Sequence, residues 1–153
     1  MARAELIDNL NQALSFELAG VIQYSQHSYL VTGPDRQVFK DFFRAQASEA
    51  QDHAEELGDK IVALGGIPTV EPAMIRQAVE LKDMLQQDLQ LERDAIAAYM
   101  SAWGSCDDQD LPTKFWLEGR IADEQMHVEE LEKLTSERQA RVNSDRIILR
   151  EVS

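Results

Sequence analysis

Apolar residues recur every three or four positions along most of this chain, which is the pattern of amphipathic α-helices. No segment shows the strict alternation of a half-buried strand. The pattern therefore predicts an all-α protein with four helices. Their expected ranges are 5–32, 38–64, 81–103 and 112–137.

The connections between these helices predict how they pair. Gly33-Pro34 ends the first helix, and the polar segment 104–110 separates the third from the fourth. Both connections are short, so each joins an antiparallel helical hairpin. The segment 65–79 contains two prolines and is too long for a tight turn, which favours a crossover between the hairpins.

This organisation predicts a four-helix bundle over residues 1–137, with one long crossover between helices 2 and 3. Residues 138–153 are mostly polar until Ile147, and we expect a short docked helix or a tail there.

The two predicted hairpins carry a repeated motif. Glu17 stands seven residues before Tyr24, and Glu92 stands seven residues before Tyr99, an offset of 75 between the glutamates. Both glutamates interrupt the apolar stripe of their helix. The spacing predicts that they face the core of the bundle.

A histidine follows each glutamate at a similar distance. His53 and His127 are 74 positions apart, and Glu49 and Glu124 precede them by four and three residues. Glu124 and His127 lie on one helix face, so both can reach one ion. Antiparallel pairing about the two turns brings Glu17 level with position 50, and Glu92 level with Glu124.

Burying several carboxylates together is costly, because each loses its hydration and they repel one another. A divalent cation removes both costs. Carboxylate oxygen combined with imidazole nitrogen suits iron, manganese or zinc. The sequence therefore predicts a metal site in the middle of the bundle.

With these motifs, residues 5–137 resemble the ferritin-like superfamily, nearest to bacterioferritins and their small relatives. The resemblance implies a dinuclear centre that binds ferrous iron and lets dioxygen or peroxide oxidise it. It implies Glu17 and Glu92 as terminal ligands, one histidine for each metal, Glu124 as a bridge and Tyr24 as a neighbour active in catalysis. The implied metal ligands are Glu17, Glu49, His53, Glu92, Glu124 and His127.

The chain departs from the family pattern at two positions. The bridging glutamate of the second helix should stand three residues before His53, where this chain has Ala50. Glu49 lies on the neighbouring face, and Gln46 is a weaker alternative ligand. Bacterioferritins bind haem through a methionine at the position of Gln51, so we expect no haem.

The amino-acid composition indicates which classes of binding partner are disfavoured. Acidic residues outnumber basic ones by 28 to 15, giving a formal net charge of -13. This charge disfavours nucleic acid and anionic membranes as partners. We see no signal peptide or membrane-spanning run, and the single Cys106 excludes an intramolecular disulfide, so we expect a cytoplasmic protein.

His27 lies off the face of Glu17 and is interpreted as a surface or interface residue.

Two classes of function follow. The first is a ferroxidase that stores or detoxifies iron, or a peroxidase or manganese-catalase-like variant without storage. The second is a bundle with a degenerate, structural metal site, since Ala50 weakens the first half of the centre. In either case we expect a homo-oligomer, as a dimer or a cage.

Overall fold

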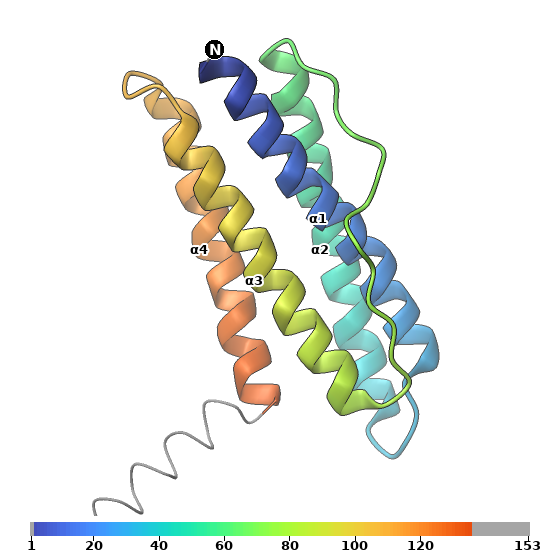
Figure 1. The fold of residues 1–153 in the computed structure, drawn as a ribbon. Coiled ribbons are helices and arrows are strands. Elements are labelled where there is room, and N and C mark those ends of the chain that lie inside the picture. The colour runs from blue at the N-terminus through green and yellow to red at the C-terminus, as the bar shows by residue number, and fades with distance from the viewer. Residues whose placement is uncertain (1, 136–153) are drawn as a thin grey trace, which may run out of the picture.

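The computed structural model describes residues 2–135, which form four helices. Figure 1 shows that these helices pack as an antiparallel bundle. The helices are α1 (Ala2–Leu30), α2 (Arg36–Ala63), α3 (Leu81–Ser105) and α4 (Leu111–Leu134). No strand occurs in residues 2–135, and the predicted all-α bundle with a crossover between α2 and α3 is confirmed. The predicted tail or helix at 138–153 lies outside the described residues.

Local sequence signals explain where the helices end. Gly65 has a φ of 88°, a left-handed conformation that glycine adopts without strain. The amide N–H of Gly66 then donates to the Ile61 carbonyl at 2.9 Å and closes the last turn of α2. At the start of α4, the Asp110 carboxylate accepts from the Thr113 backbone N–H at 3.3 Å.

The crossover runs beside α1 as an extended segment, which Figure 1 shows in green. Polar side chains of α1 form hydrogen bonds with the backbone of the crossover. Asn11 accepts from the backbone N–H of Thr69 at 2.8 Å, and the side-chain oxygen of Gln23 accepts from that of Arg76 at 2.9 Å. These bonds hold the long connection in place without regular secondary structure.

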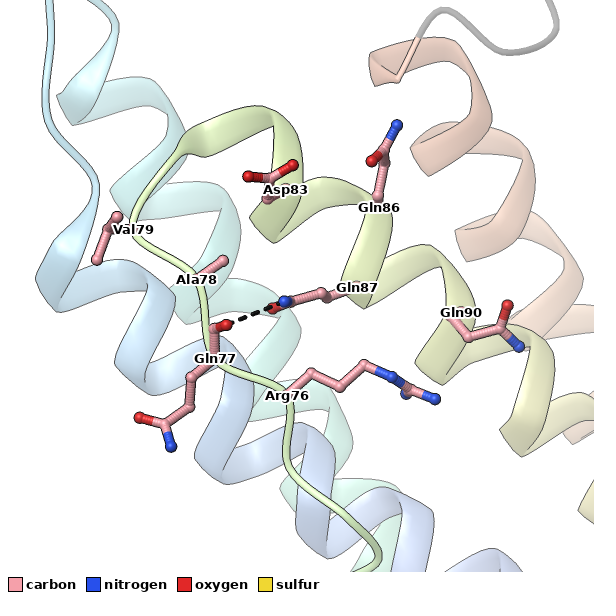
Figure 2. Close-up of a pocket in the computed structure, with 8 residues that line it drawn as sticks. All are labelled: Arg76, Gln77, Ala78, Val79, Asp83, Gln86, Gln87 and Gln90. Carbon is pink, nitrogen blue, oxygen red and sulfur yellow. Dashed lines mark hydrogen bonds between the residues drawn. The ribbon is translucent and has the colours of Figure 1, made fainter.

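A shallow groove of about 510 Å³ lies between the end of the crossover and α3 (Figure 2). The Gln87 side chain donates to the Gln77 carbonyl at 3.0 Å across this groove. Arg76 forms an ion pair with Asp94 at 3.5 Å nearby. These two contacts hold the end of the crossover against α3. The groove lies outside the cluster of glutamates and histidines.

The four helices pack unequally. α1 lies against α2 and α3, and α3 lies against α4. Within the described residues, α2 and α4 have no pair of Cα atoms within 8 Å. Side chains alone therefore span the face between α2 and α4.

The core consists of two apolar clusters. One lies toward the N-terminus of α1 and includes Leu10, Leu57, Ile61, Tyr99 and Leu117. The other lies toward the C-terminus of α1 and includes Tyr24, Phe43, Met84, Leu85 and Leu131.

A buried polar layer separates these clusters on every helix. It contains Glu17 of α1, His53 of α2, Glu92 of α3 and Glu124 of α4, all less than one tenth exposed. The prediction that the glutamates interrupt an inward apolar stripe is therefore confirmed. The fold brings carboxylates and an imidazole from all four helices to one height.

Candidate metal centre

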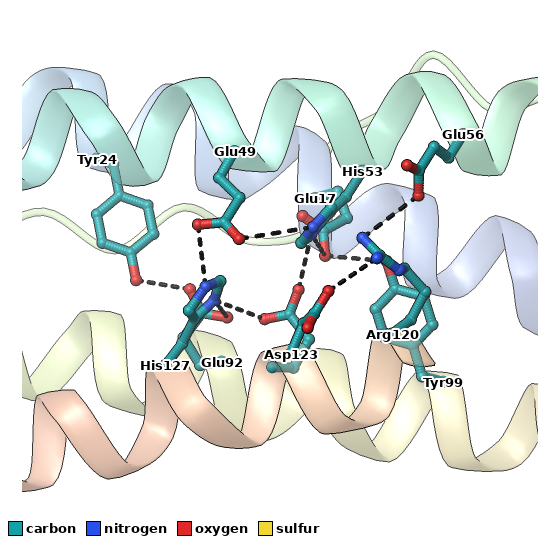
Figure 3. A network of polar contacts seen from close by, with 11 residues as sticks. Glu17, Tyr24, Glu49, His53, Glu56, Glu92, Tyr99, Arg120, Asp123 and His127 are labelled. Carbon is teal, nitrogen blue, oxygen red and sulfur yellow. Dashed lines mark hydrogen bonds and ion pairs between the residues drawn. The ribbon is translucent and has the colours of Figure 1, made fainter. Parts of the chain in front are cut away.

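Two overlapping groups of side chains can each hold a metal ion. The first contains Glu17, His53 and Glu124, and the second contains Glu92, Glu124 and His127. In each group the candidate ligand atoms lie within 4.8 Å of one another. Because Glu124 belongs to both groups, it occupies the position of a carboxylate shared between two ions. Figure 3 shows His53 and His127 turned toward this part of the bundle from α2 and α4.

The first half of the centre joins α1, α2 and α4. His53 Nδ1 lies 3.0 Å from Glu124 Oε1 and 3.6 Å from Glu17 Oε1. The hydroxyl of Tyr99 donates to Glu17 Oε1 at 3.1 Å. A tyrosine of the second hairpin thus orients Glu17 of the first.

The second half joins α3 and α4 in a matching way. His127 Nδ1 lies 3.3 Å from Glu124 Oε2 and 3.8 Å from Glu92 Oε2. The hydroxyl of Tyr24, on α1, donates to Glu92 Oε1 at 2.6 Å. The repeated motif is therefore a pseudosymmetric pair, in which each tyrosine holds the glutamate of the other hairpin.

Glu49 reaches the centre from its exposed edge. Its Oε2 lies 3.0 Å from His127 Nε2, and its Oε1 lies 3.9 Å from His53 Nε2. These are the ring nitrogens opposite the Nδ1 atoms that face Glu124. The side chain of Glu49 is 39% exposed, so it connects the two imidazoles to solvent.

Ala50, which stands where the family has a bridging glutamate, instead packs against α1. It is buried, and its Cβ would lie 3.3 Å from a Cβ built on Gly20. Such close approach requires small residues on both helices. Position 50 therefore serves helix packing in this chain. Gln46, the weaker alternative ligand, is partly exposed.

Protonated histidines offset the negative charge of the neighbouring carboxylates in the metal-free protein. Burial lowers the pKa of His53, but hydrogen bonds to Glu124 and Glu17 outweigh it and raise that pKa to about 10. For His127, burial also lowers the pKa, whereas Glu124 and Glu92 raise it to about 11. Burial, followed by the charge of Glu124, raises the pKa of Glu92 to about 8. A metal ion would replace these protons.

The interpretation of His27 as a surface or interface residue is wrong. Its side chain is fully buried, and Nδ1 lies 3.0 Å from the Asp88 carboxylate, which also accepts from Gln23 at 2.9 Å. The sequence did contain a signal. Asp88 stands one turn before Glu92 on the same helical face, where a buried carboxylate needs a partner from a facing helix.

Comparison with known proteins agrees with this geometry. Residues 7–139 match the family Ferritin, described as a ferritin-like domain. The chain is 34% identical to a bacterioferritin of Brucella melitensis, over 92% of each protein. The chain belongs to the ferritin-like family. Its similarity to bacterioferritins identifies it as a ferritin-like protein of the bacterioferritin type.

Solved structures of this family share the fold. A ferritin-like, diiron-carboxylate protein of Bacillus anthracis is 36% identical and superposes with a TM-score of 0.85, covering 88% of this chain and 98% of that one. A Rhodobacter capsulatus bacterioferritin, described with a metal-free dinuclear site and heme iron, is 29% identical with a TM-score of 0.78, covering 87% of this chain and 84% of that one. The resemblance inferred from the motifs is therefore confirmed at the level of family and fold.

Proposed function

We propose that this ferritin-like protein binds ferrous iron at a dinuclear site and oxidises it with dioxygen or peroxide, for iron storage or detoxification. The observation that carries the proposal is the sharing of Glu124 between two groups of candidate ligands, of which all but His127 are buried. A carboxylate with one oxygen directed at each histidine Nδ1 is arranged to bridge two cations.

The donor set fits iron and leaves manganese or zinc as alternatives. Each group combines two carboxylates with one imidazole, and no cysteine belongs to either group. Carboxylate oxygens favour a hard cation, and imidazole suits a first-row transition metal. Without metal, His53, His127 and Glu92 hold protons near neutral pH, and two divalent cations would displace these protons on binding.

Each proposed ligand has a distinct role. Glu17 and Glu92 are terminal ligands oriented by tyrosines, and His53 and His127 each bind one ion through Nδ1. Glu49, at the exposed edge, lies beside Nε2 of His127, the nitrogen opposite the metal-binding Nδ1, so in this position it orients the imidazole and would need a different side-chain rotamer to bind an ion. Two ferrous ions supply two electrons to dioxygen, which takes up two protons and leaves as hydrogen peroxide.

We also propose that the chain forms a homo-oligomer, as a dimer or a cage. A related protein from Bacteroides fragilis, 26% identical, is described as a dodecameric thioferritin. The described part of the chain has no helix long and apolar enough to cross a membrane. Localisation in the cytoplasm and the absence of nucleic acid partners remain predictions from composition.

The absence of haem remains a prediction from the sequence. Gln51 is exposed on α2 and donates to Glu55 at 3.2 Å, and an amide at this position offers iron no thioether sulfur. The purified protein should therefore lack the Soret absorbance of haem. A Soret band in stoichiometric amount would overturn this prediction.

An anaerobic titration with ferrous iron, followed by air, tests the proposed function. We expect two irons per chain and prompt oxidation with oxygen consumption. The Glu124→Ala variant should lose both irons and the oxidation, while Glu17→Ala and Glu92→Ala should each lose one. No oxidation above the protein-free rate in the unaltered protein would overturn the proposal.

A structural metal site is the second candidate, and Ala50 is the observation that favours it. In that case the isolated protein would hold zinc or no metal and would not consume oxygen with iron. The same glutamate variants would then lower the melting temperature strongly. Retained folding with lost oxidation supports the ferroxidase instead.

A further inference from the structure

Two carboxylates enclose the imidazoles of His53 and His127 from opposite sides. Glu124 faces the Nδ1 atoms and Glu49 faces the Nε2 atoms, each with one oxygen beside each ring. The rings lie nearly parallel, with centroids 6.3 Å apart and an angle of 15° between their planes. Figure 3 shows Glu49 reaching from α2 toward both rings. A metal ion at each Nδ1 would leave both Nε2 atoms on the side of Glu49.

The two contacts of Glu49 are unequal. Its Oε2 lies 3.0 Å from Nε2 of His127, whereas its Oε1 lies 3.9 Å from Nε2 of His53. The second distance is too long for a hydrogen bond, but charges still attract one another at this range. Glu49 therefore acts mainly on His127 and more weakly on His53.

A carboxylate beside Nε2 changes how an imidazole binds metal. A histidine ligand is neutral, so one ring nitrogen carries a proton and the other binds the ion. The negative charge of Glu49 stabilises the proton at Nε2 of His127, which directs the lone pair of Nδ1 toward Glu124 and Glu92. An outer carboxylate of this kind also makes the ring a stronger donor to the metal.

We propose that Glu49 is a positioning residue that strengthens metal binding by His127, and to a lesser extent by His53. Cations differ in their use of imidazole, which suits cobalt or zinc, whereas manganese prefers oxygen ligands. Glu49 therefore raises the preference of the centre for Co²⁺ over Mn²⁺. The proposal rests on the proposed function, because it assumes that both histidines bind metal through Nδ1.

This role differs from that of a direct ligand in a measurable way. A carboxylate bound to the ion would favour Mn²⁺ at least as much as Co²⁺, because it adds an oxygen donor. Its removal would also cost one bound ion. A carboxylate that acts through the imidazoles supports Co²⁺ more than Mn²⁺, and its removal leaves both ions bound.

The face between α2 and α4 offers a matched control. Arg120 of α4 lies 3.3 Å from Glu56 of α2 and 2.7 Å from Asp123 (Figure 3). Glu56 is 47% exposed, close to the 39% of Glu49, and belongs to neither group of candidate ligands. Glu56→Gln therefore removes the same charge and also breaks an ion pair between α2 and α4.

Separate anaerobic titrations of the metal-free protein with Co²⁺ and with Mn²⁺, by isothermal titration calorimetry, test the proposal. In Glu49→Gln we expect two Co²⁺ per chain, bound about tenfold more weakly. The ratio of the Co²⁺ affinity to the Mn²⁺ affinity should fall at least about threefold. Glu49→Ala should also retain two ions, and Glu56→Gln should leave the ratio unchanged.

The outcomes separate this proposal from the proposed function. If the unaltered protein binds no Co²⁺ and no ferrous iron, the proposed function fails. If it binds two ions and Glu49→Gln binds only one, Glu49 is a direct ligand and the positioning role is refuted. An unchanged ratio of affinities in Glu49→Gln, or an equal fall in Glu56→Gln, would refute it as well.

Discussion

At the scale of single residues, Tyr24 and Tyr99 orient two carboxylates that are candidate metal ligands. Each hydroxyl donates to a buried glutamate oxygen, at 2.6 Å to Glu92 and at 3.1 Å to Glu17. Burial first, and then the nearby carboxylates, raise the pKa of both tyrosines well above the ordinary value. Both hydroxyls therefore stay protonated and keep donating at neutral pH.

The role of Tyr24 predicts a specific defect. Tyr24→Phe removes the shorter of the two hydrogen bonds and leaves one oxygen of buried Glu92 without a donor. We expect unchanged binding of two metal ions and several-fold slower iron oxidation, measured by stopped-flow absorbance. Tyr99→Phe, which alters the other half, is the matched comparison. An unchanged rate in Tyr24→Phe would show that Tyr24 is a core residue with no part in catalysis.

The protonated histidines predict how stability depends on pH. In the folded, metal-free protein the pKa values of His53 and His127 are about 10 and about 11, above the ordinary 6.5. Their contribution is fully present below pH 6.5 and is lost as pH rises through the folded pKa values. The raised pKa of Glu92 acts in the same direction.

The melting temperature of the metal-free protein should therefore fall as pH rises from about 6.5 to about 10. Metal binding releases these protons, so metal affinity should rise over the same range. Differential scanning fluorimetry with a chelator measures the first effect. The His53→Gln and His127→Gln double variant should show a flatter profile, and an equally steep one would contradict the assignment.

At the scale of helices, a buried hydrogen-bonded pair joins α1 to α3 one turn beyond the candidate centre. His27 and Asp88 are both fully buried, and Gln23 links the same carboxylate to the backbone of the crossover. One network therefore connects three segments that are distant in the sequence. It fixes the height at which Glu92 of α3 meets Tyr24 of α1.

Removing one partner of this network should be costly. Asp88→Ala leaves His27 and Gln23 buried without their acceptor, and we expect a loss of about 3 kcal/mol in the free energy of unfolding. Urea denaturation of the metal-free protein measures this loss. Gln86→Ala, at an exposed position of α3, should change stability by less than about 0.5 kcal/mol. Equal stability of the two variants would contradict the structural role of the pair.

At the scale of the whole molecule, storage requires a closed assembly that can retain ferric product. The chain has a mass of 17.3 kDa. Light scattering after size-exclusion chromatography should give a homo-oligomer with a mass that is a multiple of this value. A closed shell, visible by electron microscopy, is expected if the chain stores iron. A dimer would rule out storage while leaving oxidation and detoxification in place.

The sequence by itself determined the four helices, their turns and the polar layer. Periodicity placed Glu17, Glu92 and Glu124 on inward stripes, and equal distances from the turns placed them at matching heights. These properties depend on spacing along one helix or one hairpin, which is readable from the order of residues.

Only the tertiary structure decided which groups meet across hairpins. The pairing of each tyrosine with the opposite glutamate, the burial of His27 and the bridge of Arg120 all depend on how the helices are rotated against one another. The close approach of α1 and α2 at Gly20 and Ala50 sets part of that rotation. It turns Glu49 toward the Nε2 atoms of both histidines, an arrangement that spacing along α2 does not specify.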